Sequence, residues 1–193
     1  MKWVKSIGGG LLGLIALAFV TLLGMSKRGE AGHMHTTIDI ARPPAEVRTW
    51  FEQPAKLTQW VAWLVEVKPV GSPASGPGSQ QEWFMLDPRD QGKRSSFVRT
   101  LESQTDSSTT ITIAAPGIGD DRATATYHAL PNGGTRLVSD SRFVYSGFFW
   151  SLLEPLVTPE AQKKEVEDLA RLKALIEASP RSPAAVSSAT PSR

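Results

Sequence analysis

The alternation of apolar and polar positions around residue 40 predicts a strand followed by two short helices. Ile38 and Ile40 alternate with polar neighbours, which is the period-two pattern of a half-buried strand. The double proline at residues 43–44 cannot continue the strand, and proline suits the first turn of a helix. Apolar residues then recur at helical spacing, and Pro54 restarts the chain into a second helical segment over residues 55–61.

Six further segments have strand-like patterns and are separated by turns rich in glycine, proline, serine and asparagine. They span residues 64–70, 82–86, 95–101, 109–115, 123–130 and 136–145. Asn132-Gly133-Gly134, between the last two, is a strong hairpin signal. Such short connections predict an antiparallel meander in which consecutive strands pair.

A long amphipathic helix is predicted to end the globular part. Its pattern becomes clear at Glu160, after an aromatic approach that Pro155 and Pro159 interrupt. One broad face of this helix carries the apolar residues Val166, Leu169, Leu172 and Ile176. Ser179-Pro180 ends the helix.

The uncharged run over residues 7–25 predicts a transmembrane helix. Its 19 residues, at about 1.5 Å each, approach the roughly 30 Å of a bilayer core. A cleaved signal peptide is the alternative, but its apolar core would normally be about 7 to 15 residues long. The candidate cleavage motif Ala16-Leu17-Ala18 lies inside the run. Basic residues flank both ends, and their slight excess before the run favours a single-pass protein of the bacterial inner membrane with its domain exported.

These patterns divide the chain into five parts. They are an N-terminal flank (1–6), a transmembrane anchor (7–25), a linker (26–35), one ligand-binding domain (36–178) and a disordered tail (179–193).

Charge and composition exclude several classes of function. The net charge of +2 arises at the ends of the chain, because residues 36–178 hold 15 basic and 18 acidic side chains. Such a domain lacks the clustered cations of a nucleic-acid surface. The chain has no cysteine, which excludes thiol catalysis and cysteine-based metal sites. His33 and His35 lie in the predicted linker without an evident third ligand, so no metal and no cofactor is predicted.

Three segments carry a resemblance to a known family. They are IDIARPPAEVRTWFEQPAKLTQW (38–60), GGTRLVSDSRF (133–143) and EVEDLARLKALIE (165–177). With the order of elements, they make residues 36–178 resemble the SRPBCC superfamily, which includes START-like and polyketide cyclase/dehydrase-like proteins. The resemblance implies an α+β helix-grip fold. In this fold a curved antiparallel sheet of about seven strands, with two short helices, grips a long C-terminal helix and leaves a cavity for an apolar ligand.

The strand patterns also favour a cavity. In the last strand, small serines lie between larger inward residues, and the neighbouring strand presents mostly alanines on one face. Direct packing of the long helix onto these small residues is the alternative. The residues predicted to line the cavity are Tyr127, Leu137, Ser139, Ser141, Phe143, Leu169, Leu172 and Ile176.

Three functions are compatible with these patterns. The favoured one is a membrane-anchored, non-catalytic module that binds or carries a lipid, a quinone or a similar apolar molecule. An enzyme of the cyclase or hydrolase type needs an acid or base beside the substrate, and no cluster of acids is expected on an inward face. The third is a protein-interaction module at the membrane.

Overall fold

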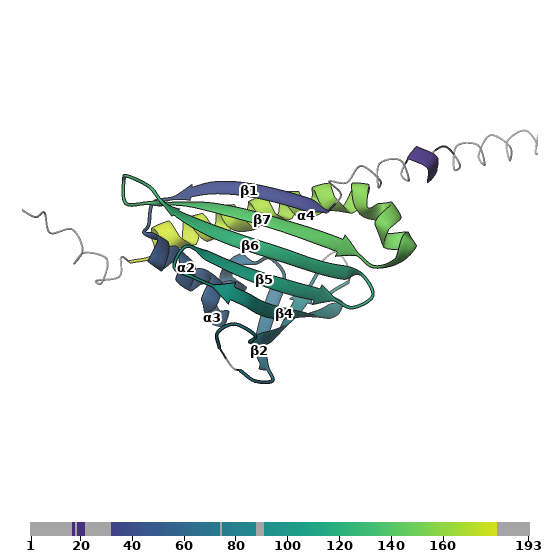
Figure 1. Ribbon diagram of the computed structural model, residues 1–193, viewed down its shortest axis with the longest axis horizontal. Coiled ribbons are helices and arrows are strands. Elements are labelled where there is room, and N and C mark those ends of the chain that lie inside the picture. Colours follow the sequence, from purple (N-terminus) through teal and green to yellow (C-terminus); the bar gives the residue numbers. More distant parts are fainter. Residues whose placement is uncertain (1–16, 18, 22–31, 74, 88–90, 181–193) are drawn as a thin grey trace, which may run out of the picture.

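The computed structural model describes residues 17, 19–21, 32–73, 75–87 and 91–180 (Figure 1). Its strands are β1 (His33–Ile40), β2 (Leu64–Val70), β3 (Gln80–Leu86), β4 (Arg94–Gln104), β5 (Ser108–Ala115), β6 (Gly119–Ala129) and β7 (Thr135–Tyr145). Its helices are α2 (Pro44–Glu52), α3 (Pro54–Trp60) and α4 (Gly147–Ala178). The predicted α+β helix-grip architecture is confirmed.

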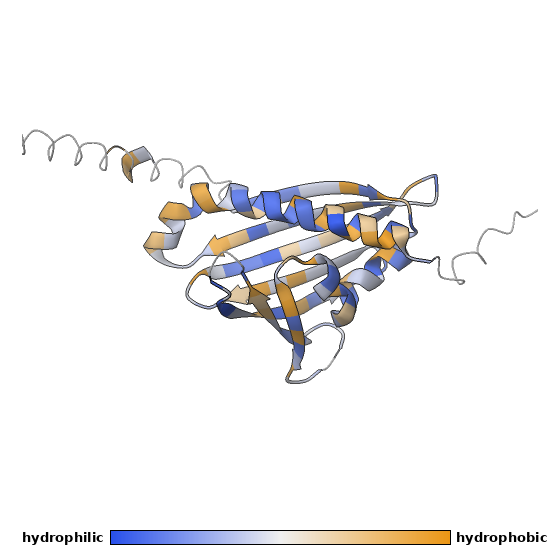
Figure 2. Ribbon diagram, turned by 180° about the vertical axis from the view of Figure 1, so that it is seen from behind, coloured by the Kyte–Doolittle hydropathy of each residue, from blue (hydrophilic) through white to orange (hydrophobic). Residues whose placement is uncertain are grey.

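All seven strands form one antiparallel sheet in the order β1-β7-β6-β5-β4-β3-β2. The predicted meander runs from β2 to β7, and β1 pairs with β7 at the far edge. The sheet curves, and α4 lies across its concave face, behind the sheet in Figure 1 and in front of it in Figure 2. The chain therefore encloses a space between sheet and helix.

The C-terminal half of α4 is packed tightly onto the sheet. Leu172 and Ile176 are fully buried, as are Leu137 of β7 and Ile40 of β1. Arg42, in the turn after β1, donates from Nη2 to the carbonyl oxygens of Glu177 and Ser179, each at 2.8 Å. These bonds satisfy carbonyls that a helix end leaves free, and they place a cation at the negative end of the helix dipole.

The pair of short helices is fastened to α4 at a second point. Asp168 of α4 is buried and accepts a hydrogen bond of 3.0 Å from the backbone N–H of Ala62, just after α3. Its other oxygen accepts one of 2.6 Å from Lys164 Nζ, one turn earlier on α4. Because both carboxylate oxygens are used, this contact fixes the distance between α3 and the middle of α4.

Several element boundaries differ from the sequence prediction, among them the starts of α4 and β1. The helix α4 begins at Gly147 and includes Pro155 and Pro159, and its first turns bend away from the rest (Figure 1). Proline removes a helical hydrogen bond and kinks a helix without always ending it. The strand β1 begins at His33, inside the predicted linker, because its pairing with β7 continues as far as Arg142.

One residue of the predicted apolar face does not face the sheet. Val166 is 47% exposed, since the core-facing stripe of α4 runs through Leu169, Leu172 and Ile176 and leaves Val166 beside it.

The predicted anchor lies almost wholly outside the described residues. Of residues 7–25, only Leu17 and residues 19–21 are described, and their backbone is helical. None of the helices within the described part of the chain is both long and apolar enough to cross a bilayer. The predicted tail also lies outside this part, apart from residues 179 and 180.

Candidate ligand-binding cavity

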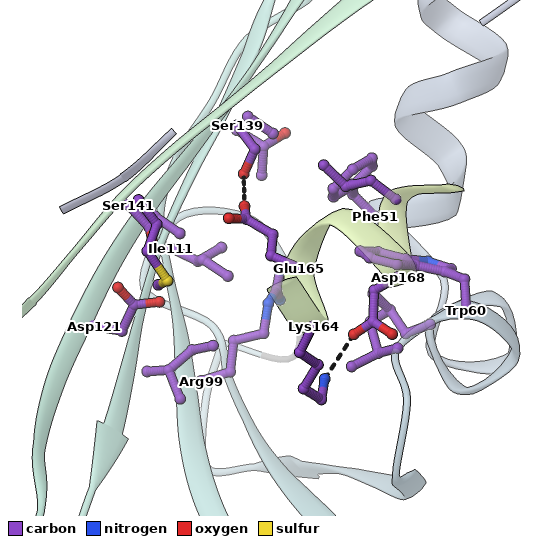
Figure 3. A pocket seen from close by; sticks show the side chains of 18 of the residues that line it. Phe51, Trp60, Arg99, Ile111, Asp121, Ser139, Ser141, Lys164, Glu165 and Asp168 are labelled. Carbon is purple, nitrogen blue, oxygen red and sulfur yellow. Dashed lines mark hydrogen bonds and ion pairs between the residues drawn. The ribbon is translucent and has the colours of Figure 1, made fainter. Parts of the chain in front are cut away.

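A cavity of ≈260 Å³ lies between the sheet and the middle of α4 (Figure 3). Its apolar walls come from every layer of the fold: Met34, Phe51, Leu57, Trp60, Val61, Trp83, Ile111, Ile113, Ala123, Ala125, Ala161 and Leu169. Its polar lining consists of Arg99, Thr109, Asp121, Ser139, Ser141, Lys164, Glu165 and Asp168. A small, mainly apolar hollow with a few convergent polar groups is the usual form of a ligand site.

The register of β6 and β7 explains why this space stays open. Ala123 pairs with Ser141 and Ala125 pairs with Ser139, so the floor below α4 is built from small side chains. The next inward pair, Tyr127 and Leu137, is large and fully packed. The hollow therefore begins where the side chains of the strand pair become too short to reach the helix.

The structure separates the eight predicted cavity residues into two groups. Ser139, Ser141 and Leu169 line the cavity. The others are not part of its lining: Tyr127, Leu137, Leu172 and Ile176 belong to the packed core, and half-buried Phe143 packs at a tilt against Tyr145, with 4.4 Å between ring centroids. A ligand contact at any of the eight stays a prediction.

Two carboxylic acids face the same space, from opposite walls. Burial first, and the charge of Glu165 second, raise the pKa of the Asp121 carboxyl to about 6. Burial also raises the pKa of Glu165, although Ser139 and Thr36 donate hydrogen bonds to its oxygens at 2.5 and 3.3 Å. Asp121 Oδ1 has no hydrogen-bond partner among the described residues. The expectation that no acids gather on an inward face is therefore wrong.

Arg99 of β4 is the most unusual group in the cavity wall. It is only 5% exposed, and burial lowers the pKa of its guanidinium to about 10, so the group is still charged at neutral pH. Its Nη1 donates to Gln81 Oε1 at 3.2 Å, and the guanidinium lies 5.6 Å from the ring centroid of Trp83. Within the described ranges, no carboxylate forms an ion pair with Arg99, and its Nε donates to no acceptor.

A second pocket, of ≈490 Å³, adjoins the first. Phe51, Arg99 and Thr109 belong to the walls of both. The second pocket is more polar, since Glu52, Gln81 and Gln104 also line it. Arg99 thus stands at the boundary between a mainly apolar space and a polar one.

The three charged cavity residues Arg99, Asp121 and Glu165 were not predicted to line the cavity, although the sequence carries a signal for each. Arg99 lies two residues before buried Leu101 in a strand, and Asp121 lies two residues before inward-facing Ala123. Glu165 precedes Leu169 by one helical turn on the buried stripe of α4. In each case a charged residue occupies an inward position of a regular pattern.

The histidines of β1 do not form a metal site with the described residues around them. His33 and His35 each lie within hydrogen-bond distance of Asp140 on the exposed face of the sheet, at 3.1 and 3.2 Å. In the part of the chain that the structure describes, no three His, Asp or Glu side chains are arranged to hold a metal ion. The absence of a metal or cofactor in the functional protein stays a prediction.

Comparisons with known proteins agree with this fold. Residues 31–177 match the model of the family described as polyketide cyclase / dehydrase and lipid transport. Among solved structures, the chain is similar to Ara h 8.0201, with 14% identity and a TM-score of 0.62 over 76% of this chain and 98% of that one. It is also similar to CV1439 from Chromobacterium violaceum, with 17% identity and a TM-score of 0.61 over 77% of this chain and 99% of that one. TTHA0849 from Thermus thermophilus is also similar (16%, 0.61; 75% of this chain, 96% of that one). No curated protein matches the sequence.

These similarities show that the fold is complete without the ends of the chain. The matched part makes up 96–99% of the three solved chains. Among the described residues, the buried hydrophobic core runs from Ile40 to Ile176. A fragment of residues 31–180 therefore contains all seven strands and the helices α2, α3 and α4 of the described fold.

The burial of Arg99 leads to a prediction about stability. Replacing Arg99 with Met should raise the free energy of unfolding by about 1–3 kcal/mol, because it removes a desolvated charge that lacks a carboxylate partner. Gln81 Oε1 would still accept the hydrogen bond from Trp83 Nε1. The measurement is urea unfolding of fragment 31–180, followed by circular dichroism.

Arg122→Met, on β6 of the same sheet, is the matched control. Arg122 is exposed and paired with Glu102, so its loss should change stability by less than about 0.5 kcal/mol. A clear loss of stability in Arg99→Met would contradict the interpretation of Arg99 as an uncompensated charge.

Proposed function

Since this chain belongs to the polyketide cyclase/dehydrase and lipid-transport family, we propose that it binds or carries an apolar small molecule, such as a lipid or a quinone, without transforming it. The observation that carries this proposal is the ≈260 Å³ cavity between the sheet and α4. Its lining of aromatic, aliphatic and alanine side chains suits an apolar guest, since such a guest gains roughly 25 cal/mol for each Å² of surface removed from water.

The size of the cavity limits the guest. At about 30 Å³ per water molecule, ≈260 Å³ has room for roughly nine waters, or a guest of about nine or ten non-hydrogen atoms. A longer chain or larger ring would have to extend into the adjoining pocket past Phe51 and Arg99. The proposal therefore favours a compact molecule, or one whose apolar end alone occupies the cavity.

An acid–base enzyme is the second candidate, and one observation favours it. Asp121 and Glu165 face the same cavity, and the pKa of Asp121 is raised to about 6, close to the value that suits proton transfer at neutral pH. Tyr127 offers less, because its hydroxyl donates to Thr109 at 3.2 Å and the ring belongs to the packed core.

We further propose that residues 7–25 anchor the domain to the bacterial inner membrane, with the domain exported. The uncharged sequence of this run supports the anchor. An apolar tip at the start of α4 also supports it, since Phe148 and Phe149 are 66% and 63% exposed. The ring of Phe19, which belongs to this run, lies 6.1 Å from that of Phe148. Exposed aromatic side chains of this kind favour the bilayer interface.

Filling the cavity should abolish retention of the guest. Ala123→Phe places a large ring on the cavity floor, whereas Arg122→Phe, the adjacent residue on the exposed face of β6, leaves the cavity unchanged. The full chains are purified in parallel and extracted, and the extracts are compared by mass spectrometry. We expect an apolar compound from the parent chain and from Arg122→Phe, and at least a tenfold smaller amount from Ala123→Phe.

Equal yields from all three chains would argue against the cavity as the binding site. Asp121→Asn, treated in the same way, separates the two candidate functions. A carrier would retain the same compound as the parent chain, whereas an enzyme would retain a chemically different one, because its substrate would no longer be converted.

The membrane arrangement can be tested with a thiol probe, because the chain has no natural cysteine. A single cysteine replaces exposed His128 in the domain, or Ser6 before the apolar run. A membrane-impermeant maleimide applied to intact cells should label His128→Cys and should label Ser6→Cys only after lysis. The reverse pattern would show that the domain faces the cell interior.

A further inference from the structure

The unused hydrogen-bond donors of Arg99 indicate which chemical class of molecule the cavity binds. A guanidinium carries five N–H donors, and only one bond from this group to a described residue is present, from Nη1 to Gln81. Buried charges in proteins are normally paired, because removing an ion from water costs several kcal/mol. Arg99 is 95% buried and lies in the cavity wall (Figure 3). Its remaining donors therefore suit an acceptor that comes from outside the chain.

The acids of the cavity are not that acceptor. Glu165 is held by Ser139 and Thr36, and Asp168 by Lys164 and the backbone of Ala62. Asp121 forms no ion pair with Arg99. Arg99 and these three acids therefore line one small space, and none of the acids forms an ion pair with Arg99.

We propose that the cavity binds an apolar monocarboxylic acid whose carboxylate pairs with the Arg99 guanidinium and whose apolar part lies between α4 and the small residues of β6 and β7. This inference rests on the proposed function and specifies its ligand class. The two oxygens of a carboxylate match the fork of a guanidinium, which can donate two parallel hydrogen bonds. The position of Arg99 at the edge of the polar pocket suits the charged end of such a guest, while Ile111 and Ile113 of neighbouring β5 suit its apolar end.

The neighbouring acids explain the choice of a monoanion over a phosphate. Asp121 and Glu165 face the same space, and their charges would repel a doubly charged group more strongly than a singly charged one. The size of the cavity also matches a carboxylic acid of about ten non-hydrogen atoms.

Octanoic acid and 1-octanol are the test probes, because they share a chain length and differ in charge. Both are titrated at pH 7 into fragment 31–180 and into its Arg99→Met and Arg122→Met variants, with binding followed by nuclear magnetic resonance. We expect Arg99→Met to weaken octanoate binding at least tenfold and to change octanol binding less than twofold. Arg122→Met should change neither.

A second measurement follows the ionisation of the bound acid itself. With octanoic acid labelled with ¹³C at the carboxyl carbon, the bound carboxyl should titrate at a lower pH than the free acid, because the guanidinium favours its ionised form. In Arg99→Met this displacement should vanish.

The outcomes separate this inference from the proposed function. If octanol and octanoate both bind but Arg99→Met weakens neither selectively, the carboxylate assignment is overturned and apolar binding stands. An upward displacement of the bound carboxyl titration also overturns the assignment. If neither probe binds the parent fragment, the proposed function fails together with the inference.

Discussion

The distance between α4 and the sheet is the constraint on which the rest of this structure depends. At one end, Leu172 and Ile176 pack against Leu137 and leave no exposed surface. Along the same strand pair, alanine and serine replace the large side chains, yet a rigid helix cannot bend inward to meet them. The hydrogen bond from the backbone N–H of Ala62 to Asp168 holds α4 at its distance from α3. The cavity therefore forms because α4 is held in place on both sides of a stretch of β6 and β7 whose side chains are too small to reach it.

The buried charged residues of the cavity do not contribute to the stability of the fold. Neither a buried guanidinium without a carboxylate partner nor a carboxyl with a pKa raised to about 6 stabilises the folded chain. Between about pH 3.8, its ordinary pKa, and about pH 6, the Asp121 carboxyl is protonated in the folded chain and ionised in the unfolded chain. Its contribution to stability therefore falls as pH rises through that window. Groups that oppose folding while facing a cavity are typical of functional sites.

The sequence predicted the architecture well because it depends on regular patterns. Alternation gave the strands, Asn132-Gly133-Gly134 gave the last hairpin, and the inward serines of β7 indicated the hollow. The sequence could not predict how far the cavity extends. Leu137 is fully packed and Ser139 lines the cavity, yet both occupy equivalent positions of the same alternating pattern. Arg99 was missed for another reason: alternation alone predicts that it faces inward, but only the fold shows that no carboxylate among the described residues pairs with it.

Crystallography under xenon pressure tests most directly whether a cavity persists between α4 and the small residues of β6 and β7. Apolar cavities of this kind bind xenon, whereas a filled core does not. We expect a xenon atom within van der Waals distance of Ala123 and Ala125, with α4 in the position described here. Crystals in which side chains fill that space, with no xenon beside either alanine, would contradict the account.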